Sequence, residues 1–286
     1  MSMKRVGVVG CGLMGSGLAE VMARSGSEVT VYEIDEQAMS AGRARIEHSL
    51  NRAVTAGKIE DGDRDDALSR ITLTTDYGAF DELELVIEAV AENEAIKTAV
   101  FTALDQAVTS PDTIFASNTS SIPIMKLAMT TSRPEKFLGL HFFNPVTVMR
   151  LVEVVPSLLT DDLTTQTAST FMTDQLGKRV ITSKDRSGFI VNALLVPYQL
   201  AAIRMLESGF ATAEDIDTGV LEGLANPMGP LTLADHIGLD TVLAVAESLY
   251  AEFKEPLYAP PPLLSRMVEA GLLGKKAGRG FYDYST

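Results

Sequence analysis

The chain has 286 residues, and its 24 Lys plus Arg against 38 Asp plus Glu give a formal net charge of −14 at pH 7. This acidic balance, without a cluster of lysine and arginine, argues against nucleic-acid binding, and no run of roughly 18 apolar residues predicts a membrane span. The single cysteine, Cys11, excludes an internal disulfide and any cysteine-rich metal site. The length predicts about two domains.

The N-terminal residues and the cysteine content indicate the cell interior. Residues 1–5 lead directly into an apolar run and do not have the pattern of a signal peptide. A single cysteine fits a reducing compartment. We therefore expect a cytoplasmic protein with no metal, no nucleic-acid partner and no membrane partner.

The first half of the chain alternates short apolar runs with segments of helical length. Near-continuous Val/Ile/Leu runs separated by helices are typical of a parallel sheet covered on both faces. The expected strands cover residues 5–9, 28–32, 83–90, 113–116, 137–141, 148–155 and 178–182. A helix over residues 163–176 separates the last two strands.

A glycine-rich turn follows the first expected strand. Gly10, Gly12 and Gly15 satisfy the pattern G-x-G-x-x-G, which allows a tight turn, the close approach of a pyrophosphate, and close packing of helix on strand. The helix that follows, with Leu13 and Met14 in its first turn, would present free N–H groups to the phosphates. The turn therefore predicts a dinucleotide site.

Glu33 follows the second expected strand, near the point about 20 residues after the glycines where dinucleotide sites carry an acidic residue. A carboxylate there can accept both ribose hydroxyls and would repel a 2′-phosphate, so it favours NAD over NADP. The alternative is a purely structural turn with an exposed Glu33. We expect Cys11, inside the turn, to be a small buried filler.

After residue 185 the pattern becomes helical. Pro197 should kink or break the first of these helices, and Thr212 with Asp215 forms a capping box before the second. The expected helices cover residues 189–207, 213–221, 231–253 and 262–270. We place a domain boundary near residue 184, with an α/β domain at 1–184 and a smaller all-helical domain at 185–286.

Longer motifs occur in order at residues 87–93, 116–121, 139–145, 226–230, 274–276 and 280–282. They resemble those of the L-3-hydroxyacyl-CoA dehydrogenases, in particular the single-function bacterial 3-hydroxybutyryl-CoA dehydrogenases of the actinobacterial type. The resemblance implies a Rossmann-type, mostly parallel sheet domain followed by a smaller all-helical domain for dimerisation. It also implies a homodimer that interconverts (S)-3-hydroxyacyl-CoA and 3-oxoacyl-CoA with NAD, preferring short chains such as hydroxybutyryl.

Oxidation of a secondary alcohol requires a base, and histidine suits this because its unperturbed pKa of about 6.5 lies near the working pH. Of the three histidines, His48, His141 and His236, only His141 ends a strand where open α/β sheets bind ligands. Glu153 is a charge within an apolar run, and a buried charge is usually paired. The resemblance makes His141 and Glu153 the catalytic pair, and an edge carboxylate facing water is the alternative for Glu153.

Two polar residues near this pair have both a binding and a structural interpretation. Ser120 lies in a polar loop just after a strand, and Asn192 stands in an otherwise apolar helical run. The resemblance implies that both hold the substrate's 3-oxygen and that Ser120 also touches the cofactor; capping or a structural hydrogen bond is the alternative. Further dinucleotide contacts implied by the resemblance are Glu92, Lys97, Asn144 and Lys276, although both lysines could be ordinary surface residues.

A short segment at residues 41–58 is locally basic, with four cations against the single acid Glu47. On a helix Arg45, Ser49 and Arg52 share one face, beside an apolar face of Ile46, Leu50 and Ala53. The resemblance places CoA recognition on a helical hairpin at about 36–70, with Ser49 the clearest match. Because Ala56 stands where some relatives carry lysine, Arg52 or Lys58 is left to hold the 3′-phosphate; a solvated charged face is the alternative.

Two other functions remain open from the sequence. A non-catalytic dinucleotide-binding regulator or structural protein would be expected to lack the histidine, serine or asparagine described above. A dehydrogenase of a small free hydroxy acid would need a cationic clamp for the carboxylate, and Arg150 is the nearest candidate.

Overall fold

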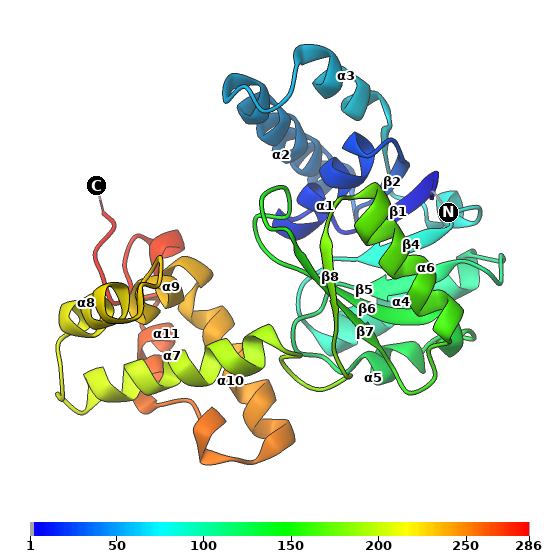
Figure 1. Ribbon diagram of the computed structural model, residues 1–286. Helices are drawn as coiled ribbons and strands as arrows, with labels where there is room; N and C mark the ends of the chain where they lie inside the picture. Colours follow the sequence, from blue (N-terminus) through cyan, green and yellow to red (C-terminus); the bar gives the residue numbers. More distant parts are fainter. Residues whose placement is uncertain (1–2, 286) are drawn as a thin grey trace. The chain divides into compact units, whose positions relative to one another are not determined.

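In the computed structural model, which describes residues 3–285, an eight-stranded sheet organises the first part of the chain (Figure 1). The strands stand in the order β3-β2-β1-β4-β5-β6-β7-β8, and only the β6–β7 pair is antiparallel. Their bounds are β1 (Arg5–Val9), β2 (Glu28–Tyr32), β3 (Ile71–Thr74), β4 (Leu85–Glu88), β5 (Ile114–Ser117), β6 (Phe137–Phe142), β7 (Leu151–Pro156) and β8 (Arg179–Thr182). The predicted α/β class with a mostly parallel sheet is confirmed.

Helices cover both faces of this sheet. Their bounds are α1 (Leu13–Arg24), α2 (Glu36–Thr55), α3 (Asp61–Ser69), α4 (Glu94–Ala107), α5 (Ile124–Ala128) and α6 (Asp162–Thr170), with single turns at Tyr77–Phe80, Pro134–Lys136 and Phe171–Gln175. Side chains of α1, α2 and α6 share one core with alternate residues of the strands. On the other face Phe101 of α4 packs edge-on against Phe137 of β6, with ring centroids 4.6 Å apart.

The order of the strands creates the ligand edge. The chain leaves the sheet at β3 and re-enters on the other side of β1 with β4, so the connections diverge between β1 and β4. In open α/β sheets this point, at the carboxyl ends of the strands, forms a crevice for ligands. The glycine-rich turn after β1 and the loops after β4, β5 and β6 all lie at this edge.

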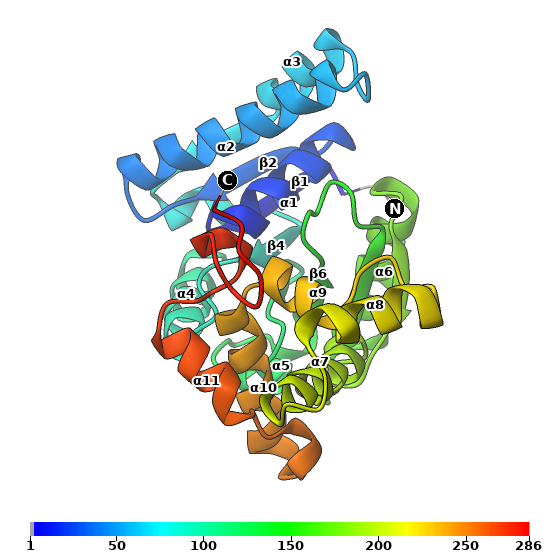
Figure 2. The same ribbon diagram turned by 90° about the vertical axis from the view of Figure 1, so that its left-hand side faces the viewer.

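The pair of helices α2 and α3 stands beside α1 and projects from the sheet (Figures 1 and 2). Buried Ile46 and Leu50 fix the apolar face of α2 against the core. Together α2 and α3 form the helical hairpin expected at about 36–70, and α3 is its outer, acidic helix. It is followed by β3, a strand that the sequence analysis missed because its four residues contain only one buried side chain, that of Ile71.

A second unit begins after Arg186 and is helical. Its helices are α7 (Val191–Glu207), α8 (Ala213–Leu224), α9 (Pro230–Ile237), α10 (Leu239–Phe253) and α11 (Pro262–Glu269), with single turns at Pro256–Tyr258 and Lys275–Ala277. They enclose their own apolar core. Among residues 3–285 no helix is both long and apolar enough to cross a membrane.

Two details of the second unit differ from the sequence expectations. The helix α7 continues through Pro197, so the proline does not break it. The expected helical stretch 231–253 consists of two helices, α9 and α10, separated by Gly238 with φ of +102°. Glycine adopts this conformation without the steric cost that a Cβ would add, which explains the change of direction there.

Candidate active site

The glycine-rich turn joins β1 to α1 and has the open shape that a dinucleotide requires. Gly10 has φ of +90°, and a Cβ on Gly15 would collide with the carbonyl oxygen of Gly10. A Cβ on Gly12 would meet no atom of the described chain within 4 Å, so the space beside this residue is open. Gly12 is also the N-cap of α1, where no side chain bonds the first free N–H groups. The residues therefore fit a pyrophosphate at the helix N-terminus.

The carboxylate of Glu33 is bonded to this turn. Its Oε1 accepts a hydrogen bond of 2.5 Å from the amide of Cys11, and its Oε2 accepts one of 3.3 Å from the amide of Ile34. Arg45 of α2 donates from Nη1 to the carbonyl oxygen of Cys11 at 3.1 Å. Arg45, assigned from the sequence to the charged face of the hairpin, thus reaches the glycine-rich turn from α2.

Cys11 is a buried filler of the turn, as expected. Its side chain is fully buried, and a Cβ on Gly42 of α2 would lie 2.7 Å from its Sγ. Burial, followed by the nearby charge of Glu33, raises the pKa of Cys11 to about 12. The thiol is therefore neutral at physiological pH and serves packing.

His141 and Glu153 form a buried pair across two adjacent strands. They stand directly opposite each other in the β6–β7 ladder, so their side chains share one face of the sheet. Nδ1 of His141 lies 2.6 Å from Oε2 of Glu153, and the side chains are 8% and 0% exposed. The ring of Phe143 packs at 4.5 Å from the imidazole. Since β7 lies between β6 and β8, the alternative of an edge carboxylate facing water is wrong for Glu153.

This arrangement determines which nitrogen can exchange a proton. A carboxylate accepts hydrogen bonds, so Nδ1 of His141 carries the proton that faces Glu153. In the neutral imidazole Nε2 is then the basic nitrogen, and the carboxylate stabilises the imidazolium that forms when Nε2 takes up a proton. The pair can therefore act as a general base and acid.

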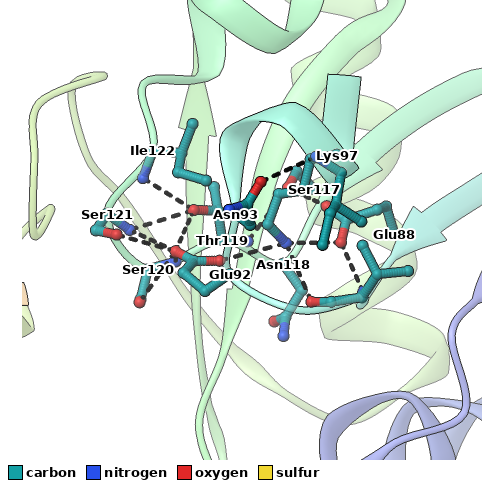
Figure 3. Close-up of polar contacts among 12 residues, drawn as sticks. Glu88, Glu92, Asn93, Lys97, Ser117, Asn118, Thr119, Ser120, Ser121 and Ile122 are labelled. Atoms are coloured by element: carbon teal, nitrogen blue, oxygen red, sulfur yellow. Dashed lines mark hydrogen bonds and ion pairs between the residues drawn. The ribbon is translucent and has the colours of Figure 1, made fainter. Parts of the chain in front are cut away.

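Ser120 lies in the loop after β5, and a carboxylate holds this loop (Figure 3). Oε1 of Glu92 accepts hydrogen bonds from the amide of Ser120 at 2.9 Å and from the amide and hydroxyl of Ser121 at 3.1 and 3.0 Å. Desolvation alone would raise the pKa of Glu92, but Lys97 and these donors outweigh it, so its pKa lies below the usual range. Glu92 is thus a charged anchor for the serine loop.

Lys97 is not a surface lysine. Its side chain is 1% exposed, and its ammonium lies 2.6 Å from Oε1 of Glu88 and 3.3 Å from Oε2 of Glu92. A predicted dinucleotide contact at Lys97 would therefore act through Glu92, which is 34% exposed. Sequence reasoning missed Glu88, although a carboxylate ending an apolar strand is the same signal that singled out Glu153.

Two further residues brace the site. The side-chain oxygen of Asn118 accepts a hydrogen bond of 2.9 Å from the backbone amide of Phe142, the residue after His141. The backbone amide of Asn118 donates to the carbonyl oxygen of Glu88. Asp185 accepts from the amides of Ile124 and Met125 at 2.7 and 2.8 Å and so holds the start of α5. Neither was singled out from the sequence, because polar loop residues carry no distinguishing pattern there.

The remaining predicted residues of the first unit are at its surface. Asn144 is exposed in the loop after β6, and Ser49 of α2 is half-buried. Arg52 and Lys58 are exposed and form no ion pair with the described residues, whereas Arg43 on the same helix pairs with Glu47 at 2.9 Å. Two cations on the hairpin are thus available to an anionic ligand.

In the second unit, Asn192 lies in the first turn of α7 and is partly exposed. Lys276 pairs with Asp240, with Nζ 2.6 Å from Oδ1. The other two histidines have ordinary positions: His48 is exposed on α2, and Nδ1 of His236 lies 2.9 Å from the carbonyl oxygen of Thr232. Within residues 3–285 no group of three or more His, Cys, Asp or Glu is arranged to hold a metal ion.

Comparison with known proteins gives consistent matches over both units. The family description "3-hydroxyacyl-CoA dehydrogenase, NAD binding domain" matches residues 5–186, and "3-hydroxyacyl-CoA dehydrogenase, C-terminal domain" matches residues 188–284. A 3-hydroxybutyryl-CoA dehydrogenase of Mycobacterium tuberculosis is 58% identical over 283 residues, which cover 99% of each chain. The human mitochondrial hydroxyacyl-coenzyme A dehydrogenase is 41% identical over 98% of this chain and 91% of its own.

Solved structures agree. The crystal structure of FadB2 from M. tuberculosis has a TM-score of 0.98 at 58% identity, covering 99% of this chain and 100% of that chain. The crystal structure of an (S)-3-hydroxybutyryl-CoA dehydrogenase from Ralstonia eutropha has a TM-score of 0.95 at 45% identity, covering 100% of both chains.

Proposed function

The chain belongs to the 3-hydroxyacyl-CoA dehydrogenase family, and from this premise we propose that it interconverts (S)-3-hydroxybutyryl-CoA and acetoacetyl-CoA with NAD(H). This substrate is supported by the similarity to 3-hydroxybutyryl-CoA dehydrogenases of other bacteria, and the cofactor by the match of residues 5–186 to the family's NAD binding domain. Membership of a dehydrogenase family favours an enzyme over a non-catalytic regulator. The observation that carries the chemistry is the buried His141–Glu153 pair at the ligand edge of the sheet.

In the proposed mechanism His141 removes the proton of the substrate's 3-hydroxyl through Nε2, while Glu153 keeps the proton on Nδ1 and stabilises the imidazolium. NAD held at the glycine-rich turn would supply the acceptor for the hydride that leaves C3 of the substrate. In the reverse direction His141 returns the proton to the 3-oxygen. A histidine paired with a carboxylate can serve both directions, because imidazole both accepts and donates a proton.

The substrate's 3-oxygen needs hydrogen-bond donors that are in place before the reaction. Ser120 fits this role because its amide, 2.9 Å from Oε1 of Glu92, fixes its backbone, while its hydroxyl makes only a long contact of 3.4 Å to the same oxygen and can turn to donate to the substrate. The family resemblance assigns the same role to Asn192. Steady-state turnover of acetoacetyl-CoA with NADH tests the proposal, and equal turnover of free acetoacetate would favour the free hydroxy acid instead.

For the dinucleotide and CoA sites we propose the residues that the sequence analysis expects. We assign the pyrophosphate to the turn at Gly10, Gly12 and Gly15 with the N–H groups of Leu13 and Met14, and the adenosine ribose to Glu33. The family resemblance adds Glu92, Lys97, Asn144 and Lys276 to this site. We assign the CoA phosphates to the surface formed by Ser49 and Arg52 of α2 and Lys58 of the turn after α2, because its two cations have no ion-pair partner in the described chain.

We also propose that the protein is a homodimer joined through its second unit. Apolar side chains of that unit are exposed, including Leu194 at 71%, Phe210 at 78% and Leu224 at 65%. Burial of such a surface against a second copy would remove it from water. The single cysteine supports a cytoplasmic location, which cell fractionation tests.

A further inference from the structure

A buried carboxylate that the proposed mechanism does not use lies at the end of β4. The side chain of Glu88 is 0% exposed. Its Oε1 accepts hydrogen bonds from the amide of Val90 at 2.7 Å and from the ammonium of Lys97 at 2.6 Å, and its Oε2 accepts one from the hydroxyl of Ser117 at 2.6 Å. A buried charge is tolerated only when it is paired and hydrogen-bonded in this way.

Glu88 belongs to a closed ring of polar contacts (Figure 3). From Glu88 the ring passes through Lys97 to Oε2 of Glu92, and Oε1 of Glu92 accepts from the hydroxyl of Thr119 at 2.5 Å. It closes where the amide of Thr119 donates to the hydroxyl oxygen of Ser117 at 3.3 Å, which directs the Ser117 proton toward Glu88. The ring therefore joins the ends of β4 and β5 to α4.

The loop that carries Ser120 is hydrogen-bonded to two members of this ring, Glu92 and Thr119. Glu92 receives the amides of Ser120 and Ser121, and the hydroxyl of Thr119 accepts from the amides of Ser121 and Ile122 at 3.2 and 2.9 Å. Lys97 is the only member that carries a positive charge, and two carboxylates share it. The place of Glu92, and with it the loop, thus depends on how strongly Glu88 holds Lys97.

We propose that Glu88 is a positioning residue for Ser120, acting through Lys97 and Glu92. The proposal rests on the proposed function, in which Ser120 binds the substrate's 3-oxygen. When Glu88 loses its charge, Lys97 is drawn toward Glu92 alone, and Glu92 moves relative to the amides that it accepts. Displacement of a binding group by about 1 Å lowers a rate by up to about 100-fold.

The variant Glu88→Gln tests this with little change of shape. The amide can direct its oxygen at Val90 and Lys97 and its NH₂ at Ser117, whose hydroxyl can accept as well as donate. The variant therefore keeps the shape of the ring and removes the negative charge that holds Lys97. The matched control is Glu20→Gln on α1, because Glu20 is likewise buried, at 1% exposed, but pairs with Arg24 outside the ring.

Two measurements decide the proposal. Amide hydrogen exchange at Ser120, Ser121 and Ile122 is expected to rise at least about tenfold in Glu88→Gln and to stay unchanged in Glu20→Gln. The kcat with acetoacetyl-CoA and NADH is expected to fall about 10- to 100-fold. In a Ser120→Ala background the same change at Glu88 should alter kcat less than about threefold. If Glu88 acts on kcat by positioning Ser120, its effect is lost once the hydroxyl of Ser120 has been removed.

The failures of the two proposals are distinguishable. Unchanged exchange in the serine loop, or a full additive effect in the Ser120→Ala background, would overturn the role of Glu88. A wild-type protein without turnover would contradict the proposed function. The exchange measurement would still show whether Glu88 holds the serine loop in place. If Glu88→Gln does not fold, Ser117→Ala opens the ring at its opposite side and is expected to raise exchange in the same three amides.

Discussion

His141 of β6 faces Glu153 of β7 in an antiparallel ladder, with Nδ1 2.6 Å from Oε2 and neither side chain more than 8% exposed. Glu153 lies on a strand that is paired on both sides, so its backbone has little freedom to move. The imidazole therefore has a fixed tautomer and a fixed direction. The carboxylate of Glu153 supports both properties.

The first prediction concerns that carboxylate. We expect Glu153→Gln to lower kcat by about 10²- to 10⁴-fold, because the amide neither fixes the tautomer nor stabilises the imidazolium. NADH binding, measured by fluorescence titration, should change little. The control Glu28→Gln removes an exposed carboxylate on β2 and should leave kcat unchanged. A kcat within threefold of wild type in Glu153→Gln would contradict the role of Glu153.

The second prediction concerns the choice of nicotinamide cofactor. Glu33→Gln removes the charge that repels a 2′-phosphate and leaves Arg45 beside the turn, so we expect the preference for NADH over NADPH, as a ratio of kcat/KM, to fall at least about tenfold. Steady-state kinetics with both cofactors measures this ratio. Glu36→Gln makes the same charge change at the first residue of α2, three residues further along the chain, and should not alter the ratio. An unchanged ratio in Glu33→Gln would show that other groups select the cofactor.

The parts that the sequence could predict are those that depend on local pattern. Buried apolar runs indicated seven of the strands, and the glycine spacing indicated the turn after β1. Glu153 was identified because a charge in a buried run needs a partner, and the structure places that partner, His141, directly opposite. In each case a short stretch of sequence contains the physical cause.

The parts that the sequence could not predict depend on contacts between distant segments. Arg45 reaches the carbonyl oxygen of Cys11 only because α2 packs over the glycine-rich turn. Lys97 had the pattern of a surface residue on α4, and its burial follows from the two carboxylates contributed by β4 and by the following loop. The strand β3 is short and mostly uncovered, so pairing with β2 rather than its own composition determines it.

The third prediction concerns the CoA surface. We expect Arg52→Ala and Lys58→Ala each to raise the KM for acetoacetyl-CoA about fivefold, the effect of an exposed phosphate contact worth about 1 kcal/mol, with kcat nearly unchanged. The control is Arg43→Ala, because Arg43 already pairs with Glu47. A KM that stays constant in both variants would place the CoA phosphates elsewhere.

The fourth prediction concerns assembly. Light scattering after size exclusion should give a mass of twice the 30.7 kDa of the chain. Leu224→Glu places a charge on the exposed apolar surface of α8 and is expected to shift the protein toward a monomer. Leu158→Glu adds the same charge at a 91% exposed position of the first unit and should leave the mass unchanged. A monomeric wild type would contradict the homodimer.

The most direct test of the central claim is the turnover of acetoacetyl-CoA with NADH by His141→Ala, measured together with NADH binding. If His141 is the general acid and base, kcat falls by about 10²- to 10⁴-fold while the Kd for NADH stays within threefold of wild type. A variant that binds NADH normally and turns over acetoacetyl-CoA at the wild-type rate would contradict the assignment of His141.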